Sequence, residues 1–257
     1  MKLLFITCFM TLLQSVHAQS FPPDKGCIEL SKIFLYAVRI GDSSENYIQQ
    51  LKAIDISQLK KQLATDDEKK AFWLNIYNAF IQKLLTEHPE KYKNRNTFFS
   101  KKQIIIAGIS MSPDDIEHGI LRRSKIKWSM GYLNKTFPPS FEKDFRVTKL
   151  DNRIHFALNC GAKSCPPIAY YDPHKINMQL ELATKIYLSG EAEYKKDSHT
   201  VYLPKIMNWF RGDFGGKKGL KKFLGNYHII DAGQQTKLRF KKYDWTLFLN
   251  NYKSQQG

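Results

Sequence analysis

Cysteine is scarce in this sequence: the 257 residues contain only four, which are Cys8, Cys27, Cys160 and Cys165. Disulfide-held scaffolds need a much higher cysteine content than this. A disulfide scaffold is therefore excluded, and the fold must depend on a hydrophobic core. The composition allows such a core, because 42% of the residues are hydrophobic and 25% are charged, as in ordinary globular proteins.

Long apolar runs are also missing beyond the N-terminus. A basic residue, Lys2, precedes an apolar stretch from Leu3 to Leu13, and small residues follow up to Ala18. This stretch is too short to span a bilayer and is typical of a secretory signal. We therefore expect residues 1–18 to be a signal peptide, the mature protein to be soluble and periplasmic or secreted, and no transmembrane segment to follow.

Acidic residues are few relative to basic ones, with 24 Asp and Glu against 40 Lys and Arg and a net charge of +16. The lysines occur in scattered pairs such as Lys69-Lys70 and Lys221-Lys222, without a dominant basic helix or a recognition motif. We therefore expect no nucleic-acid partner. The basic surface is suited instead to an anionic component of the cell envelope. The composition leaves the substrate and the oligomeric state open.

Helical and extended patterns alternate unevenly along the chain. Helical spacing or capping signals predict helices at 27–40, 44–54, from 57 onwards, 65–87, 112–122, 152–159, 175–188, 204–210 and 217–224. The segment 152–159 is short enough that a strand remains the alternative there. Short β-branched or alternating runs predict strands at 103–107, 200–203 and 238–245, and 128–140 has the composition of a loop. We expect one α+β domain over 19–257, helix-rich in its first half, with a small sheet contributed mainly by the second half.

Three amides follow one stripe of the longest predicted helix. Asn75, Asn78 and Gln82 stand at positions i, i+3 and i+7, close to the aromatic residues Trp73 and Tyr77. Asparagine is a poor helix former, so these amides are expected to face a cleft or to clamp a loop, and a solvent-facing stripe is the alternative interpretation. Asn75 and Asn78 are therefore candidate catalytic residues, and Trp73 and Tyr77 are candidate binding residues.

A second group of polar residues lies in the predicted helix that opens at Ser112. Glu117 and Arg122 flank His118, and Asp114 stands four residues before this histidine, where it can orient the imidazole. Glu117 and His118 are candidate catalytic residues and Arg122 is a candidate binding residue. A solvent-exposed histidine without a function is the alternative interpretation.

The densest group of reactive side chains comprises His155, Cys160, Ser164 and Cys165. Once a signal peptide carrying Cys8 is removed, the cysteine count is odd, so at least one thiol is free, metal-bound or paired with another molecule. Cys160 is a candidate catalytic residue, and His155, Ser164 and Cys165 are candidate binding residues. Buried cysteines that serve only as small apolar side chains are the alternative.

Five segments occur in a characteristic order, namely AFWLNIYNAF, DDIEHGILR, RIHFALNCGAKSCPPI, MNWFRGDFG and YDWTLF. With these segments the chain resembles the family called domain of unknown function 547, over roughly Ala71 to Phe248. The resemblance implies a single domain. It implies no particular reaction or substrate.

The residues themselves favour a cysteine-dependent hydrolase or acyl transferase, which needs a thiolate, a base and a polar stabilising group. Cys160 is the preferred nucleophile because Gly161 leaves backbone amides accessible, whereas Cys165 is restricted by Pro166. His118 is the preferred base, since His155 lies on a different face of its predicted helix. No cofactor is needed for this chemistry.

Three alternatives remain open at this stage. Cys160 and Cys165 could form a reversible pair in a thiol redox module, although their spacing is not C-x-x-C. His118, His155 and the two cysteines are zinc-type ligands, but their spacing does not match zinc modules, so no metal is expected. The third alternative is a non-enzymatic binding domain of the cell envelope.

The enzyme hypothesis makes a geometric prediction. The amide stripe, the His118 segment and the Cys160 turn should line one cleft, with His118 in contact with a cysteine sulfur and an asparagine amide nearby. A separation of more than about 10 Å between His118 and both sulfurs, with no cleft between them, would argue for a binding or structural domain.

Overall fold

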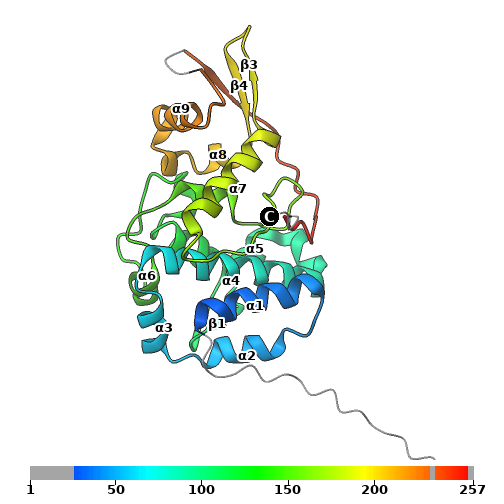
Figure 1. Ribbon diagram of the computed structural model, residues 1–257, viewed down its shortest axis with the longest axis vertical. Helices are drawn as coiled ribbons and strands as arrows, with labels where there is room; N and C mark the ends of the chain where they lie inside the picture. Colours follow the sequence, from blue (N-terminus) through cyan, green and yellow to red (C-terminus); the bar gives the residue numbers. More distant parts are fainter. Residues whose placement is uncertain (1–25, 232–234, 254–257) are drawn as a thin grey trace, which may run out of the picture.

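The computed structural model describes residues 26–231 and 235–253, so the expected signal peptide, 1–18, lies outside the described residues. The chain folds into helices and short strands, with helices dominating the first half (Figure 1). The helices before the first strand are α1 (Cys27–Ile40), α2 (Glu45–Ala53), α3 (Ile56–Gln62), α4 (Asp66–Glu87), η1 (Pro89–Asn94) and α5 (Arg95–Ser100). The later helices are η2 (Asp115–Leu121), η3 (Lys127–Ser129), α6 (Ser140–Phe145), η4 (Asn152–Phe156), α7 (Ile176–Glu191), α8 (Ile206–Trp209), η5 (Arg211–Phe214) and α9 (Gly216–Asn226).

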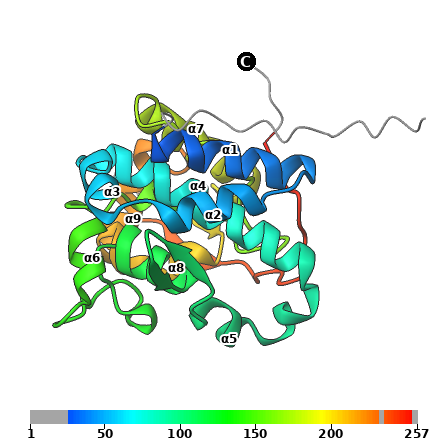
Figure 2. The same cartoon turned by 90° about the horizontal axis from the view of Figure 1, so that it is seen from below.

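Helix α4 forms the centre of the helical part. Thr65 and Glu68 close a reciprocal capping box at its start, and Pro89 follows its end, as the sequence predicts. Every residue from Lys69 to Gln82 is buried, which marks a helix enclosed on all sides. Helix α1 packs along α4, with the rings of Phe34 and Phe80 4.9 Å apart. Figure 2 shows α1, α2 and α3 arranged around α4.

Within the described residues the strands form two small sheets, one in each half of the chain. β1 (Ile104–Ile106) and β2 (Ile109–Met111) form a hairpin, whose turn residues Ala107 and Gly108 both have positive φ. β4 (Thr200–Leu203) pairs antiparallel with β3 (Glu193–Lys195) and parallel with β5 (Lys237–Phe240). The predicted α+β class, with a small sheet mainly from the second half, is confirmed.

The predicted strand 238–245 is too long. β5 ends at Phe240, after which the chain leaves the sheet and crosses to the helical part of the molecule. There Leu247 forms a β-bridge with Ala162 and Trp245 packs against the larger apolar cluster. The alternation of side chains therefore continues beyond the hydrogen-bonded strand.

The predicted helix at Ser112 forms, but most of it is a π-helix. Ser112 and Asp115 cap its start reciprocally, and the Arg122 N–H donates to the Glu117 carbonyl oxygen five residues earlier at 2.8 Å. A Cβ on Gly119 would lie 2.7 Å from the Glu142 carboxylate of α6. Glycine is therefore needed where α6 approaches, and the wider turn is of a kind often found at functional sites.

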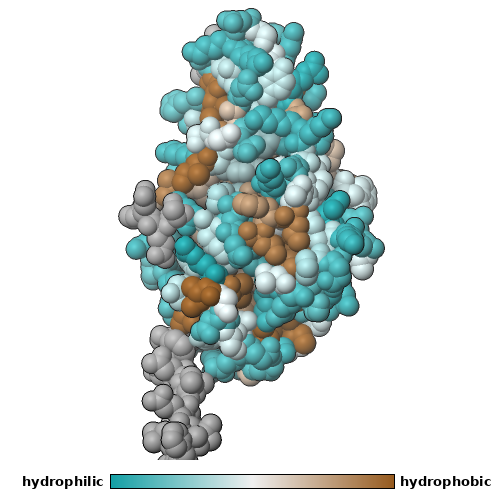
Figure 3. Space-filling view, turned by 90° about the vertical axis from the view of Figure 1, so that its right-hand side faces the viewer, coloured by the Kyte–Doolittle hydropathy of each residue, from teal (hydrophilic) through white to brown (hydrophobic). Residues whose placement is uncertain are grey.

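The apolar side chains of the described residues form two buried clusters. The larger includes α1, α4 and the hairpin, and the smaller includes Phe156, Val201, Met207 and Leu220. Tyr243 contacts both clusters. Hydrophilic side chains cover most of the face in Figure 3, with an apolar group near its middle. No helix in the described ranges is long and apolar enough to cross a membrane.

Candidate functional site

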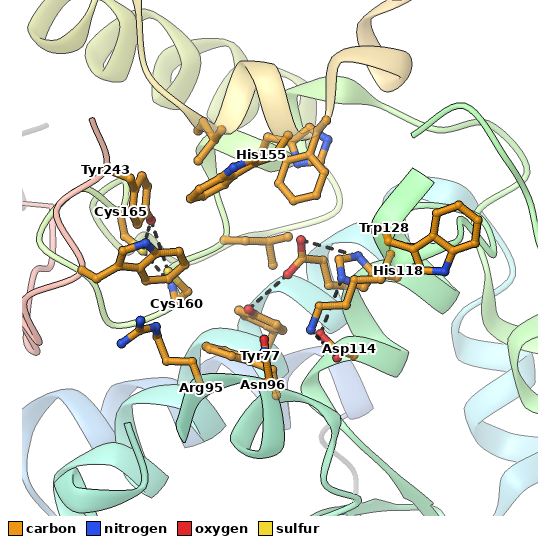
Figure 4. A pocket seen from close by; sticks show the side chains of 18 of the residues that line it. Tyr77, Arg95, Asn96, Asp114, His118, Trp128, His155, Cys160, Cys165 and Tyr243 are labelled. Atoms are coloured by element: carbon orange, nitrogen blue, oxygen red, sulfur yellow. Dashed lines mark hydrogen bonds and ion pairs between the residues drawn. The ribbon is translucent and has the colours of Figure 1, made fainter. Parts of the chain in front are cut away.

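A cavity of about 450 Å³ is lined by residues of both apolar clusters, among them Tyr77 of the larger cluster and Ile206 of the smaller one. Its walls come from α4, α5, η2, the 158–166 loop, α8 and the segment around Tyr243. Six of the side chains singled out from the sequence line it, as Figure 4 shows for most of them; they are Tyr77, Glu117, His118, His155, Cys160 and Cys165. Residues from three distant parts of the chain therefore share one site.

The two asparagines lie outside the cavity and clamp loops instead. The Asn75 side chain donates to the Tyr171 carbonyl oxygen and accepts the Tyr171 N–H, each at 2.9 Å. Asn78 donates to the Ala157 carbonyl oxygen at 3.0 Å and accepts the Asn159 N–H at 2.9 Å. The structure therefore places neither amide among the reacting groups. Asn78 instead fixes the backbone immediately before Cys160.

We expect Asn78→Ala to lower the free energy of unfolding by about 2 kcal/mol, because two buried backbone groups lose their partner. Chemical denaturation measures this value, with the exposed Asn226 at the end of α9 as the control position. N226A should change stability by less than about 0.5 kcal/mol. Equal effects of the two substitutions would contradict the clamping role of Asn78.

Trp73, Ser164 and Arg122 also do not line the cavity. Trp73 is fully buried and packs edge-on against Phe72 and Phe145. The Ser164 hydroxyl accepts the N–H of Asp244 at 2.9 Å, which anchors the segment that carries the neighbouring Tyr243. These residues therefore support the walls of the cavity and are not placed to contact a molecule bound inside it.

The two thiols lie together at one end of the cavity. The Cys160 N–H donates to the Cys165 sulfur at 3.0 Å, and the Tyr243 hydroxyl oxygen lies 3.3 Å from the Cys160 sulfur and 3.1 Å from the Cys165 sulfur. Gly161 makes the tight turn between them possible with φ of 82°. All three described cysteines are free, and Cys160 is the more exposed of the pair.

The surroundings of the two thiols shift their pKa values in opposite directions. A hydrogen bond from the Cys165 side chain lowers the pKa of Cys160 against the opposing effect of burial, and the Tyr243 hydroxyl and the Ala162 N–H lower it further. Burial raises the pKa of Cys165 well above its ordinary value and raises that of Cys27 to about 12. Burial and the two thiols raise the pKa of Tyr243, so its hydroxyl keeps its proton. The site therefore favours a single thiolate, on Cys160.

His118 lies on another wall and does not contact a sulfur. Arginine has no acceptor, so the Arg122 Nη1 that lies 2.9 Å from His118 Nδ1 donates to it. The ring proton is then on Nε2, which faces Asp114 Oδ1 at 3.5 Å. Within 26–231 and 235–253, no hydrogen bond joins His118 or His155 to a sulfur. The expected direct contact between His118 and Cys160 is therefore not formed.

A carboxylate that the sequence did not single out connects the histidines. Asp213, whose side chain is fully buried, accepts Arg122 Nε–H at 2.6 Å and His155 Nε2–H at 2.9 Å. Burial raises the pKa of Asp213, but the hydrogen bonds from His155 and Arg122 outweigh it and lower the pKa overall. Burial lowers the pKa of His155, which stacks on Phe210 with ring centroids 4.1 Å apart. Arg122 and Asp213 therefore fix both rings.

The wall beside the thiols is aromatic. Trp245 packs against Trp209 and Tyr243, with ring centroids 5.4 Å and 4.5 Å apart. Trp128, at another part of the lining, is 77% exposed. In the described part of the chain, no cluster of three His, Cys, Asp or Glu side chains is arranged to hold a metal ion.

Together these features define an α+β protein with a thiol pair, two fixed histidines and aromatic walls around one cavity. The model of the family "Protein of unknown function, DUF547" matches residues 61–188, and the chain resembles this family over that segment. The match includes the thiols and both histidines but ends before Asp213 and Tyr243. No curated protein and no solved structure matches the chain.

Proposed function

We propose that the protein is a cysteine-dependent hydrolase or acyl transferase with Cys160 as the nucleophile. The observation that carries this proposal is the environment of the Cys160 sulfur, which lies 3.3 Å from the Tyr243 hydroxyl oxygen and next to Cys165, whose sulfur accepts the Cys160 N–H at 3.0 Å. Hydrogen bonds to the charged form stabilise a thiolate without an imidazole partner. The thiolate also borders a cavity large enough for a small substrate.

In the proposed reaction the Cys160 thiolate attacks the acyl carbon of the substrate. A carbon–sulfur bond forms, the bond to the amine or alcohol breaks, and the leaving group takes a proton. Water, or an acceptor in the transferase case, then attacks the thioester carbonyl and releases Cys160 as a thiolate. The protonated Tyr243 hydroxyl donates a hydrogen bond to the sulfur or to the developing oxyanion.

The acid–base function is assigned to Glu117 on the other wall, and His118 beside it is assigned a hydrogen bond from its Nε2–H. The Tyr77 hydroxyl donates to Glu117 Oε2 at 3.2 Å, and Asp114 and Arg122 orient the ring of His118. Because these groups do not contact the sulfur, they act on the leaving group and on the attacking water. His155 and Asp213 are positioning residues in this scheme.

The acylation step is tested with an activated aryl ester such as p-nitrophenyl acetate. A burst of p-nitrophenol should accompany the addition of one acetyl group to the peptide that contains Cys160. C160A should abolish both signals, whereas C27A should preserve them, because the buried Cys27 thiol does not ionise near neutral pH. An acetyl group on another residue, or no adduct at all, would overturn the assignment of Cys160.

We expect Cys165→Ala to raise the pKa at which Cys160 reacts with iodoacetamide, because the hydrogen bond from the Cys165 side chain that lowers this pKa is lost. Cys165→Ser keeps a donor at this position and should shift the profile less. The rate constant for modification of Cys160, followed by mass spectrometry between about pH 6 and 9, gives both values. Identical profiles for wild type, C165A and C165S would contradict the role of Cys165.

A thiol redox function is the second candidate, because both sulfurs lie within 3.3 Å of one Tyr243 hydroxyl oxygen. Exchange with a small disulfide oxidant would join the sulfurs and transfer two electrons and two protons to that oxidant, which is reduced to two thiols. After treatment with oxidised glutathione, an intact mass lower by two hydrogens would support this function. A protein that keeps both thiols, or retains a mixed disulfide, would exclude it.

We also propose that the protein is exported to the periplasm or secreted, on the basis of the pattern in residues 1–18. N-terminal sequencing of the mature protein tests this location. Cleavage after Ala18 gives a protein that begins at Gln19, and an intact Met1 would contradict export by this signal.

A further inference from the structure

The basic side chains at the cavity differ in their partners among the described residues. Of the two basic side chains that line the cavity besides the histidines, Lys127 pairs with Asp114 at 2.7 Å. Among the residues that the structure describes, no carboxylate pairs with the other, Arg95. Its guanidinium carbon instead lies 4.7 Å from the centre of the Trp245 ring and 5.4 Å from that of Tyr92.

The position of Arg95 is fixed by the fold. It is the first residue of α5, whose N-terminus is capped by the Asn94 side chain through the N–H of Thr97. The side chain is half-buried, and contact with two rings restricts the plane of the guanidinium. The N–H groups at its edge are thus held ready for a planar anion.

Arg95 lies on the thiol side of the cavity. Trp245, which contacts the guanidinium, packs against Tyr243 with ring centroids 4.5 Å apart. Tyr243 in turn contacts the Cys160 sulfur at 3.3 Å. In Figure 4, Arg95 and Cys160 lie on the same side of the cavity, and His118 and Asp114 lie on the other.

We propose that Arg95 binds a carboxylate of the substrate beside Cys160. The substrates are then acyl compounds with a free carboxylate close to the reacting carbonyl, such as short peptides or N-acyl amino acids. This inference rests on the proposed function of Cys160. It deepens that function by naming the substrate class and the residue that selects it.

The charges of the cavity favour a carboxylate over a phosphate. Burial raises the pKa of Asp114, but hydrogen bonds with His118 and Lys127 outweigh burial and lower it, so Asp114 is ionised at neutral pH. Lys127 is already paired with Asp114, so the single charge of the Arg95 guanidinium balances a carboxylate but would leave one charge of a phosphate dianion unbalanced. The planar carboxylate also matches the fork of the guanidinium.

Two alkylating reagents of similar size test the proposal on the intact protein. Iodoacetate and iodoacetamide both form a carbon–sulfur bond and release iodide, but only iodoacetate carries a carboxylate. The ratio of their rate constants at Cys160, divided by the same ratio for free cysteine, should be about tenfold or higher, the effect of roughly 1.4 kcal/mol of binding. Arg95→Met should return this normalised ratio to about 1.

Arg39 offers a matched control, because it also lies over two aromatic rings, those of Tyr252 and Tyr170, and does not line the cavity. R39M should preserve the preference for iodoacetate. Rapid reaction with iodoacetamide but no preference for iodoacetate, or a preference that survives in R95M, would overturn the carboxylate site. Failure of both reagents to label Cys160 ahead of Cys27 would instead overturn the proposed nucleophile.

A binding measurement separates the two proposals further, because it needs no reactive thiol. In the C160A protein, calorimetry should show that N-acetylglycine binds at least about tenfold more tightly than N-acetylglycinamide. The additional Arg95→Met substitution should remove this difference. Equal binding of acid and amide by C160A would contradict the carboxylate site whatever the behaviour of Cys160.

Discussion

Asp213→Asn is expected to lower the free energy of unfolding by about 3–5 kcal/mol at neutral pH. Asp213 is the acceptor for both Arg122 and His155, and its side chain is fully buried. An amide at this position leaves the buried Arg122 guanidinium without a counter-charge. The two histidines also lose the group that connects their positions, so the acylation burst should fall together with stability.

The pH dependence of this effect has a defined sign. The pKa of Asp213 is lowered in the folded state. The contribution of Asp213 to the free energy of unfolding is therefore complete above the ordinary aspartate pKa near 4, and it is lost as the pH falls through the folded-state pKa. The difference in stability between wild type and D213N should therefore be largest at neutral pH and decrease in acid. Chemical denaturation at a series of pH values measures it.

Asp144 provides the control for D213N, because it pairs with Lys60 at 2.9 Å on the surface. D144N should cost no more than about 1 kcal/mol, because exposed ion pairs contribute little. If D213N is as mild as D144N, or if its effect grows in acid, the Arg122–Asp213–His155 network does not stabilise the fold in this way.

Gly212→Ala is expected to destabilise the protein by about 3 kcal/mol, at the upper end of the usual cost of overpacking. A Cβ on Gly212 would lie 2.5 Å from the carbonyl carbon of Gly131 and 2.7 Å from the amide nitrogen of Tyr132. Both atoms belong to the backbone, so no side-chain rotation relieves the clash. The displaced residue would be the direct neighbour of Asp213, and the histidine network should be disturbed as well.

Gly225 in α9 is the matched control for G212A, since no described atom lies within 4 Å of a Cβ built there and its φ is not positive. Gly225→Ala should be neutral or stabilising by up to about 1 kcal/mol, because alanine favours a helix. Thermal unfolding of the two variants separates these outcomes. A G212A protein as stable as G225A would show that the contact between Gly131 and Gly212 is not tight.

The helices were predictable from the sequence where their signals are local. The capping box of Thr65 and Glu68, the stop at Pro89 and the left-handed Gly41 after α1 all act within a few residues. The π-helical form of η2 was not predictable. It accompanies the close approach of Glu142 to Gly119, and a contact with a distant helix leaves no local pattern.

The candidate site was predictable only in part for the same reason. Cysteine and histidine are rare enough to identify, and Cys160, Cys165, His118 and His155 do share one cavity. Asp213 lies 58 residues after its partner His155, and Tyr243 lies 83 residues after its partner Cys160. Aspartate and tyrosine are also too common for one of them to be identified from its residue type alone. Asp213 occurs in the segment MNWFRGDFG and Tyr243 in the segment YDWTLF. These two segments were the sequence features that could have pointed to them.

The ionisation of Cys160 tests the central claim most directly. The ultraviolet absorbance of the thiolate, followed against pH in wild type and in C160A, gives the titration of this thiol by difference. The predicted midpoint lies below the ordinary cysteine value of about 8.5, because Cys165, Tyr243 and Ala162 donate to the thiolate. A midpoint at or above the ordinary value would contradict a Cys160 nucleophile stabilised by this cavity.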